Sequence, residues 1–177
     1  MVSQPWYEVG KWSIDANMSP MLGEVLTEFT SRIDEQLFHR LGEEAICIVD
    51  CAPGTSTVRV MGNPCLSHEG GRGNHNVYLL VFRPETVKLS RKAALGEVAH
   101  QFAHLVLRLD HGVDSESFPA GEEMADTLAA GWGFKGEIEA KVAEWKQLEG
   151  QGAVAGPEGC QAATKLRKKK SGKAKTS

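Results

Sequence analysis

"SRKAALGEVAHQFAHLVLRLDH", residues 90–111, is the stretch on which the architecture of this 177-residue chain depends. Ser90 is a suitable helix cap, because a serine hydroxyl can accept a hydrogen bond from a backbone N–H in the first turn. The apolar residues that follow recur at helical spacing, and no proline interrupts them. The stretch therefore predicts a helix from about Arg91 to Leu109.

The polar side chains of this predicted helix fall on one arc. At roughly 100° per residue, His100 and His104 lie about 40° apart, and Glu97 and Gln101 follow within about 100° of His100. The opposite arc is apolar and includes Phe102. Two histidines one turn apart, flanked by a carboxylate, can reach one metal ion, although the same pattern also fits a solvent-facing polar stripe.

The next segment, "GEEMADTLAAGWGF" (121–134), adds carboxylates. It predicts a second helix that begins near Glu122 and breaks at 131–136. A hydrolytic zinc site usually has three protein ligands and an open fourth position, so one carboxylate here would complete a pair of histidines. Only one of Glu122 and Glu123 can face the metal, because adjacent helical residues point about 100° apart. Asp126, one turn after Glu122, can accept the outer N–H of a ligand histidine and orient its ring.

The two segments together resemble a known class of enzymes. "VAHQFAHLVL" followed by "EEMADTLAAGWGF" is similar to the small zincins of the gluzincin type, in which H-E-F-A-H on one helix precedes E-x-x-A-D on the next. The IrrE/ImmA-like peptidases and the HtpX-like membrane peptidases share this arrangement. The resemblance covers roughly residues 76–134. It implies a zincin-like fold and a zinc-dependent metallopeptidase that hydrolyses a peptide or protein substrate.

The resemblance also implies roles for particular residues. His100, His104 and Glu122 correspond to the Zn²⁺ ligands, and Asp126 corresponds to the carboxylate that orients a ligand histidine. The E-x-x-A-D spacing favours Glu122 over Glu123 as the third ligand. The resemblance further implies that a strand, here 76–82, lies beside the cleft, where it can pair with an extended substrate.

The chain departs from this family at the position of the general base. The family has a glutamate after the first histidine, and here the residue is Gln101. An amide cannot take up the proton, so general-base assistance of roughly 10²–10⁴-fold is lost. Glu97 is the only substitute on the same arc, about 6 Å back along the helix axis, where it would serve as a base or as a fourth ligand. Hydrolysis is expected to be crippled, as in a pseudoenzyme or an inactivated variant, and the alternative is a non-catalytic zinc-binding scaffold for a protein or nucleic-acid partner.

Two other zinc sites fit the sequence less well. A metzincin-like site would use Asp110 as its third ligand, but that motif needs a glycine where this chain has Leu107. A structural zinc site would use Cys47, Cys51, Cys65 and His68. Residues four apart on a strand lie about 13 Å apart, too far for one ion, so Cys47 and Cys51 are expected to be buried core thiols.

The remaining elements predict an α+β layout. The fold expected is a small antiparallel sheet packed on an N-terminal helix and on the H-x-x-x-H helix, followed by the helix that carries Glu122. In chain order, the other predicted elements are a helix over 20–41, a strand–turn–strand over 45–51 and 56–62, a glycine-rich loop over 63–75, a strand over 76–82 and a last helix over 137–148.

Charge and length divide the chain in two. From Gly159 onward there are seven basic residues and no acidic one, whereas the other 158 residues hold 13 basic and 23 acidic residues. This asymmetry predicts one folded domain over 1–150 and a disordered basic tail over 151–177. The tail is either a solvated end or a contact for nucleic acid or an acidic partner.

Hydropathy predicts a cytoplasmic protein that does not enter the membrane. The N-terminus has no basic patch followed by an apolar run, as a signal peptide would. No stretch approaches the roughly 18–20 apolar residues that span a bilayer. In a reducing compartment the four cysteines are expected to be thiols.

Overall fold

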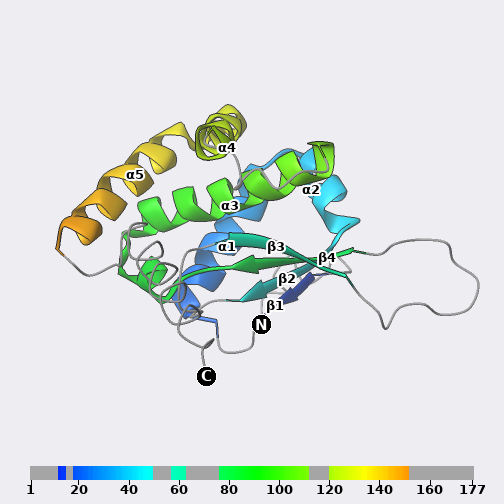
Figure 1. Cartoon of the computed structure of the whole chain (residues 1–177), viewed down its shortest axis with the longest axis horizontal. Helices are drawn as coiled ribbons and strands as arrows, with labels where there is room; N and C mark the ends of the chain where they lie inside the picture. Colours follow the sequence, from blue (N-terminus) through cyan, green and yellow to red (C-terminus); the bar gives the residue numbers. More distant parts are fainter. Residues whose placement is uncertain (1–11, 15–17, 50–56, 63–75, 112–119, 152–177) are drawn as a thin grey trace, which may run out of the picture.

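The computed structural model of the chain describes residues 12–14, 18–49, 57–62, 76–111 and 120–151. In this part of the chain the protein is α+β and mostly helical (Figure 1). A sheet forms one layer, helix α3 (Arg91–His111) lies across it, and helices α4 (Gly121–Ala129) and α5 (Lys135–Gly150) cover α3 from the other side. The predicted α+β class is confirmed.

The N-terminal helical region consists of two helices, so the prediction of one helix over 20–41 is wrong. Helix α1 spans Pro20–Arg32 and helix α2 spans Glu35–Gly42. Ile33 between them has extended backbone angles, and the carboxylate of Asp34 accepts a hydrogen bond from the Leu37 backbone N–H at 2.8 Å. The chain breaks here because Asp34 caps a new helix, which helical periodicity alone does not reveal.

Among the described residues, the sheet has four strands in the order β1-β2-β4-β3. Their bounds are Trp12–Ile14 for β1, Ala45–Val49 for β2, Thr57–Gly62 for β3 and Asn76–Val81 for β4. Strands β1, β2 and β4 run parallel, and only β3 and β4 pair antiparallel. The expected antiparallel sheet is therefore wrong for most of its pairings. Helices α1 and α2 supply the long crossover connection that the parallel neighbours β1 and β2 require.

Two further expectations about the strands are corrected by this order. Strands β2 and β3 do not form a hairpin, because β4 lies between them. Strand β4 is paired on both sides, so the predicted strand 76–82 has no open edge for a substrate; the edges of the sheet are β1 and β3. The sequence "NVYLLV" suits this inner position, since apolar runs are typical of strands with neighbours on both sides.

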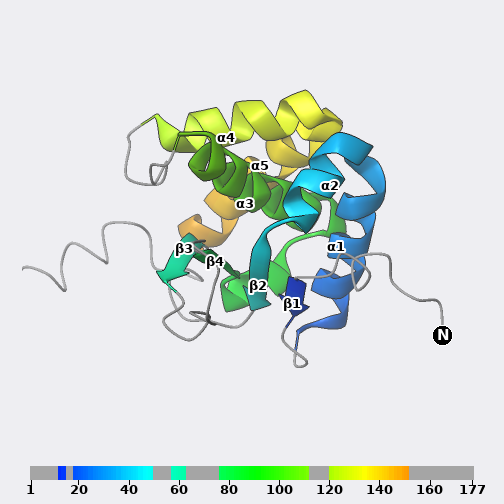
Figure 2. The same ribbon diagram turned by 90° about the vertical axis from the view of Figure 1, so that its right-hand side faces the viewer.

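Helix α3 is the centre of the core. Every residue from Ala93 to Leu107 is buried, so the solvent-facing polar stripe is excluded. On its apolar arc, the Phe102 ring stacks on Phe29 of α1, with 4.6 Å between centroids, and on Trp12 of β1. Figure 2 shows α1 flanking α3 on one side while the sheet lies below it. Both arcs of α3 therefore face protein, and its polar arc lies against α4 and α5.

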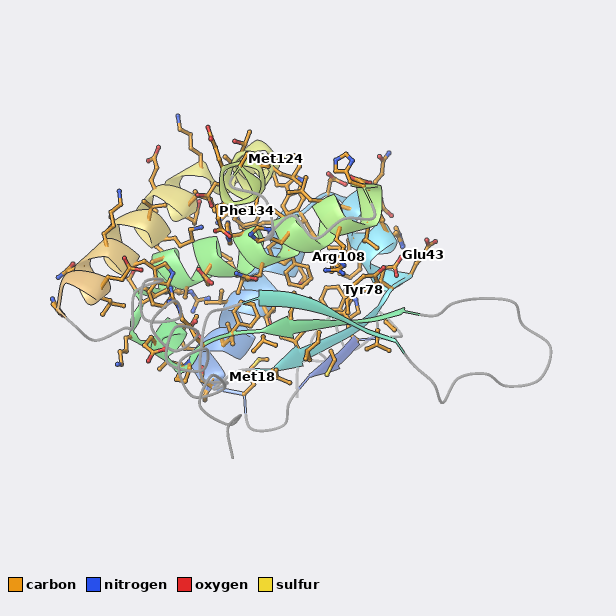
Figure 3. All side chains as sticks on the ribbon, in the orientation of Figure 1. Met18, Glu43, Tyr78, Arg108, Met124 and Phe134 are labelled. Carbon is orange, nitrogen blue, oxygen red and sulfur yellow. The ribbon has the colours of Figure 1, made fainter. Side chains whose placement is uncertain are left out.

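The sheet packs one face against α3. Ile46 and Ile48 of β2 and Tyr78 and Leu80 of β4 are buried, and the residues that alternate with them are half-buried. In Figure 3 the Tyr78 side chain lies in the layer between the sheet and α3. Cys47 alternates with the buried isoleucines and is half-buried, so the prediction of a core thiol at this position is wrong.

The helical hairpin over α3 has the predicted break. After α4, a π-helical turn over Ala130–Phe134 leads into α5, and Gly133 has a φ of 93°. Such a positive φ is readily adopted only by glycine. Helix α5 then returns along α3 so closely that a Cβ atom on Gly96 would lie 2.2 Å from the Glu137 carbonyl oxygen. The break at Gly133 and the small residue at Gly96 together bring α5 onto the polar arc of α3.

Several predictions fall outside the described residues. These are the glycine-rich loop over 63–75, the rival ligands Cys51, Cys65 and His68, and all but the first residue of the predicted basic tail. Helix α5 ends at Gly150, where the tail was expected to begin. Among the described helices, none has the length and apolar character needed to cross a membrane.

Candidate metal centre

Three predicted ligands from two helices converge at one point. The Nε2 atoms of His100 and His104 lie 3.0 Å apart. Glu122 brackets them, with Oε2 at 3.2 Å from His100 Nε2 and Oε1 at 3.4 Å from His104 Nε2. Tetrahedral zinc with ligands at about 2.0–2.1 Å needs ligand atoms about 3.3 Å apart. The spacing of these ligand atoms is close to that value, and they form the one group of this kind among the described residues.

The local helix geometry explains the convergence. His100 and His104 are one turn apart on α3, and both rings are almost completely buried, at 4% and 2% exposed. Glu122 lies in the first turn of α4, and its side chain is 67% exposed. The site therefore lies at the interface of α3 and α4, with the histidines inside and the carboxylate at the solvent side.

Asp126 contacts the outer ring nitrogen of the first histidine. Its Oδ1 lies 2.7 Å from His100 Nδ1, and Lys141 Nζ of α5 donates to the same oxygen at 2.6 Å. A carboxylate only accepts hydrogen bonds, so the His100 proton resides on Nδ1. Once Nε2 carries no proton, its lone pair can bind a metal ion, and the neutral Nδ1–H tautomer is the form that does so.

The electrostatics of the cluster favour a positive charge. Burial lowers the pKa of His100, but its hydrogen bonds to Asp126 and Glu122 outweigh that effect and leave the pKa above the usual value for histidine. The bonds from His100 and His104 hold the pKa of Glu122 far below its usual range. Burial raises the pKa of Asp126, but the hydrogen bonds from His100 and Lys141 lower that pKa by a larger amount. The pKa of Asp126 therefore lies below its usual value. The ionised carboxylates of Glu122 and Asp126 can thus balance the positive charge of a proton or of a metal ion.

Gln101, which the sequence resemblance places at the position of a general base, lines the same cavity as His100 and Glu122. It is buried, and its Nε2 donates to Glu97 Oε1 at 3.3 Å. Its Oε1 has no hydrogen-bond partner among the described residues. A cavity of about 100 Å³ is lined by Gln101, His100 and Glu122. The buried Oε1 of Gln101 beside the ligands is the second feature that fits a metal site. Ligands and water at such a centre carry hydrogen-bond donors, which can satisfy a buried acceptor.

Glu97 does not join the ligand group. Its Oε2 accepts from the Trp145 indole N–H at 2.9 Å, and its Oε1 accepts from Gln101. The cluster with metal-binding geometry contains His100, His104 and Glu122 alone among the described residues. The two oxygens of Glu97 are thus engaged by protein donors, which does not support its role as fourth ligand or substitute base.

Other sequence candidates lie away from the centre. Glu123 is exposed and lines a separate apolar pocket with Met124, whose side chain lies on the outer side of α4 (Figure 3). Asp110, the metzincin-like candidate, is paired with Arg40 of α2. His111, at the last position of α3, is exposed and lies about 16 Å along the axis from His100. Glu122 is the one of the two adjacent glutamates that faces the histidines.

Three residues that line the cavity were missed from the sequence: Arg83, Lys141 and Trp145. Lys141 and Trp145 had a detectable signal. Together with Ile138 they follow helical spacing, so a lysine occupies a position on the buried stripe of α5. Arg83 follows β4, and its guanidinium lies 3.3 Å from the Trp145 ring centroid, a contact that requires the fold to be known.

Comparisons of the chain with protein-family models, with curated proteins and with solved structures found no match.

Proposed function

We propose that this chain binds one Zn²⁺ through His100, His104 and Glu122, and that the centre is of the metallopeptidase type with its base position held by Gln101. The observation that carries the proposal is the convergence of three ligand atoms with separations of 3.0–3.4 Å. The zincin-like relationship belongs to the same proposal, supported by the order of the motifs and by Asp126 beside His100.

The chemistry expected of such a centre follows from the donors present. A zinc ion with two histidines and one glutamate polarises a carbonyl group and lowers the pKa of a water ligand. Asp126 keeps the His100 proton on Nδ1, and Lys141 holds Asp126 in place. Gln101 can accept a hydrogen bond from a group beside the metal but cannot remove its proton. Peptide hydrolysis is therefore crippled in the chain as written.

A second candidate function is a non-catalytic zinc-binding scaffold that holds a protein or nucleic-acid partner. The observation in its favour is that Gln101 is integrated into a buried hydrogen-bond chain with Glu97 and Trp145. The cavity at the centre remains lined by charged groups in either case, including Arg83 and Lys141. The two candidates share the metal and differ in whether a carboxylate at position 101 produces hydrolysis.

Metal analysis tests the shared part of the proposal. We expect one zinc ion per chain after dialysis against trace zinc, and none in His100→Ala/His104→Ala. The exposed histidine His39 provides the control, since His39→Ala should keep the full amount of metal. Zinc that stays at the same level in the double alanine variant would show that the site is elsewhere.

Hydrolysis tests the catalytic part. The chain as written should not digest a denatured protein, whereas variants with a carboxylate at position 101, beginning with Gln101→Glu, should do so. The rate should rise by at least about 100-fold, as expected for general-base catalysis. A chelator should abolish the activity and zinc should restore it. A metal-loaded Gln101→Glu protein without activity would favour the scaffold.

A further inference from the structure

A buried chain of hydrogen bonds connects α5 to the base position of α3. The Trp145 indole N–H donates to Glu97 Oε2 at 2.9 Å, and Gln101 Nε2 donates to Glu97 Oε1 at 3.3 Å. All three side chains are buried, and all three line the cavity beside the ligands. Glu97 is thus the shared acceptor of two donors.

The directions in this chain follow from the chemistry of its members. An indole only donates, and a carboxylate only accepts, so Trp145 must donate to Glu97. The amide of Gln101 can satisfy Glu97 only with its nitrogen. Its carbonyl oxygen must therefore point away from Glu97, and that buried oxygen has no partner among the described residues.

We infer that Glu97 is the positioning residue of the centre, and that Glu97 and Gln101 form an acceptor–donor pair, so that position 101 carries a carboxylate at full stability only when the two groups are exchanged together. Glu97 turns the Gln101 amide so that its oxygen faces the cavity shared with His100 and Glu122. The catalytic consequence of this inference rests on the proposed function, whereas the coupling of the two residues does not.

The single change Gln101→Glu breaks this pair. It removes the N–H that Glu97 accepts and brings two carboxylates to about the 3.3 Å that now separates Gln101 Nε2 from Glu97 Oε1. Neither carboxylate can donate to the other, and both positions are buried, which is unfavourable for like charges.

The exchange Glu97→Gln/Gln101→Glu removes the conflict. Trp145 can donate to the oxygen of the new amide at position 97. The nitrogen of that amide can donate to the new carboxylate at position 101, whose second oxygen then faces the cavity. The exchange leaves one carboxylate and one amide at positions 97 and 101, so the net charge of the cavity is unchanged. Arg83 and Lys141 therefore still have one of these two carboxylates in the same lining.

A double-mutant cycle tests the coupling without any need for activity. The thermal midpoints of the four proteins are measured in a chelator: the chain as written, Glu97→Gln, Gln101→Glu and the exchange. We expect Gln101→Glu to lose about 5–10 °C or to fail to fold, and the exchange to return within about 3 °C of the starting chain. Gln147→Glu, on the exposed part of α5, adds the same charge and should change the midpoint by about 1 °C or less.

The outcomes separate the inference from the proposed function. The inference is overturned if the change in thermal midpoint of the exchange equals the sum of the changes in the two single variants. It is also overturned if the exchange fails to fold while Glu97→Gln folds. With zinc, the exchange should hydrolyse a denatured protein about tenfold or more faster than Gln101→Glu. Coupled midpoints without hydrolysis in either protein would refute the metallopeptidase proposal and leave the inference standing.

Discussion

At the scale of single residues, the centre depends on which atom of each side chain faces which partner. Asp126 accepts from both His100 and Lys141, so a buried lysine and a ligand histidine share one carboxylate oxygen. A buried ammonium group is tolerated only with such a partner. Lys141 therefore couples the position of α5 to the orientation of the His100 ring.

The adjacent glutamates provide the sharpest test at this scale. Glu122→Gln should weaken zinc binding about 100-fold or more, because it replaces an anionic ligand in direct contact with both histidines. Glu123→Gln removes the same charge one residue away, where the side chain lines a different pocket, and should leave the affinity within about twofold. Competition with a chromophoric chelator measures both. The reverse pattern would identify Glu123 as the ligand.

At the scale of elements, the centre depends on the close approach of α3 and α5. A Cβ atom on Gly96 would lie 2.2 Å from the Glu137 carbonyl oxygen and 2.5 Å from its carbon, and both are backbone atoms of α5. Gly96→Ala should therefore destabilise the protein by about 1–3 kcal/mol and separate Lys141 from Asp126. Denaturant unfolding provides the measurement.

A second glycine in a helix supplies the control for Gly96. A Cβ atom on Gly23 of α1 would meet nothing within 4 Å. Gly23→Ala should therefore stabilise the protein by about 0.5–1 kcal/mol through helix propensity alone. If both substitutions were stabilising, the close approach of α3 and α5 would be wrong.

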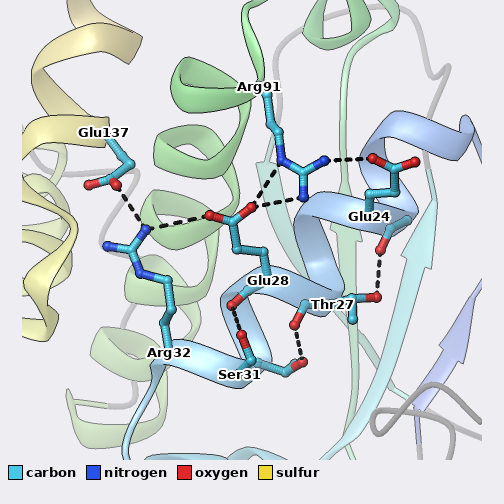
Figure 4. A network of polar contacts seen from close by, with 9 residues as sticks. Glu24, Thr27, Glu28, Ser31, Arg32, Arg91 and Glu137 are labelled. Atoms are coloured by element: carbon cyan, nitrogen blue, oxygen red, sulfur yellow. Dashed lines mark hydrogen bonds and ion pairs between the residues drawn. The ribbon is translucent and has the colours of Figure 1, made fainter.

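Helix α1 is joined to α5 by an ion pair that makes stability depend on pH. Figure 4 shows Arg32 of α1 between Glu28 and Glu137, and its Nη1 lies 2.8 Å from Glu137 Oε1. Burial raises the pKa of Glu137, but the hydrogen bond from Arg32 more than offsets it and leaves the pKa below its usual value. The folded carboxyl thus has the lower pKa. Its contribution is present above the unfolded value of about 4.3 and is lost as the pH falls through the folded value.

Arg32→Met should lower the free energy of unfolding at pH 7 by about 0.5–1 kcal/mol, since the pair is partly exposed. The difference between the two proteins should shrink when thermal unfolding is repeated at pH 3, because that pH lies below the unfolded pKa of Glu137 and part of the contribution of the ionised carboxylate is then lost. In a Glu137→Gln background, the effect of Arg32→Met should depend less on pH, because only the longer contact of Arg32 with Glu28 remains. A difference between the two proteins that is larger at pH 3 than at pH 7 would contradict the assignment of this ion pair.

At the scale of the whole molecule, the metal is expected to stabilise the packing of the helices. The ligands come from α3 and α4, and Asp126 connects the same centre to α5 through Lys141. Zinc at about 100 times its dissociation constant should add about 2.7 kcal/mol to the free energy of unfolding. For a domain of this size the thermal midpoint should rise by about 5–10 °C. His100→Ala/His104→Ala should show no such rise, and an equal rise there would indicate binding elsewhere.

The sequence by itself determined the features that arise within one helix or between adjacent ones. His100 and His104 meet because residues four apart share a helix face. Ser90 caps α3, with its hydroxyl 3.2 Å from the Ala93 backbone N–H, and Gly133 marks the break that was predicted. The prediction of Glu122 over Glu123 came from the resemblance to the E-x-x-A-D motif. These features depend on backbone geometry over a few residues, which a sequence carries directly.

Only the tertiary structure decided which distant segments lie together. The order of the strands and the burial of α3 from Ala93 to Leu107 depend on packing between segments far apart in the chain. The same holds for Trp145, which donates to Glu97 from 48 residues away. Glu97 in turn orients the Gln101 amide and so determines which atom of Gln101 faces the candidate metal centre. The periodicity of a sequence predicts which face of a helix a side chain lies on. Which other element packs against that face depends on the packing of the whole molecule.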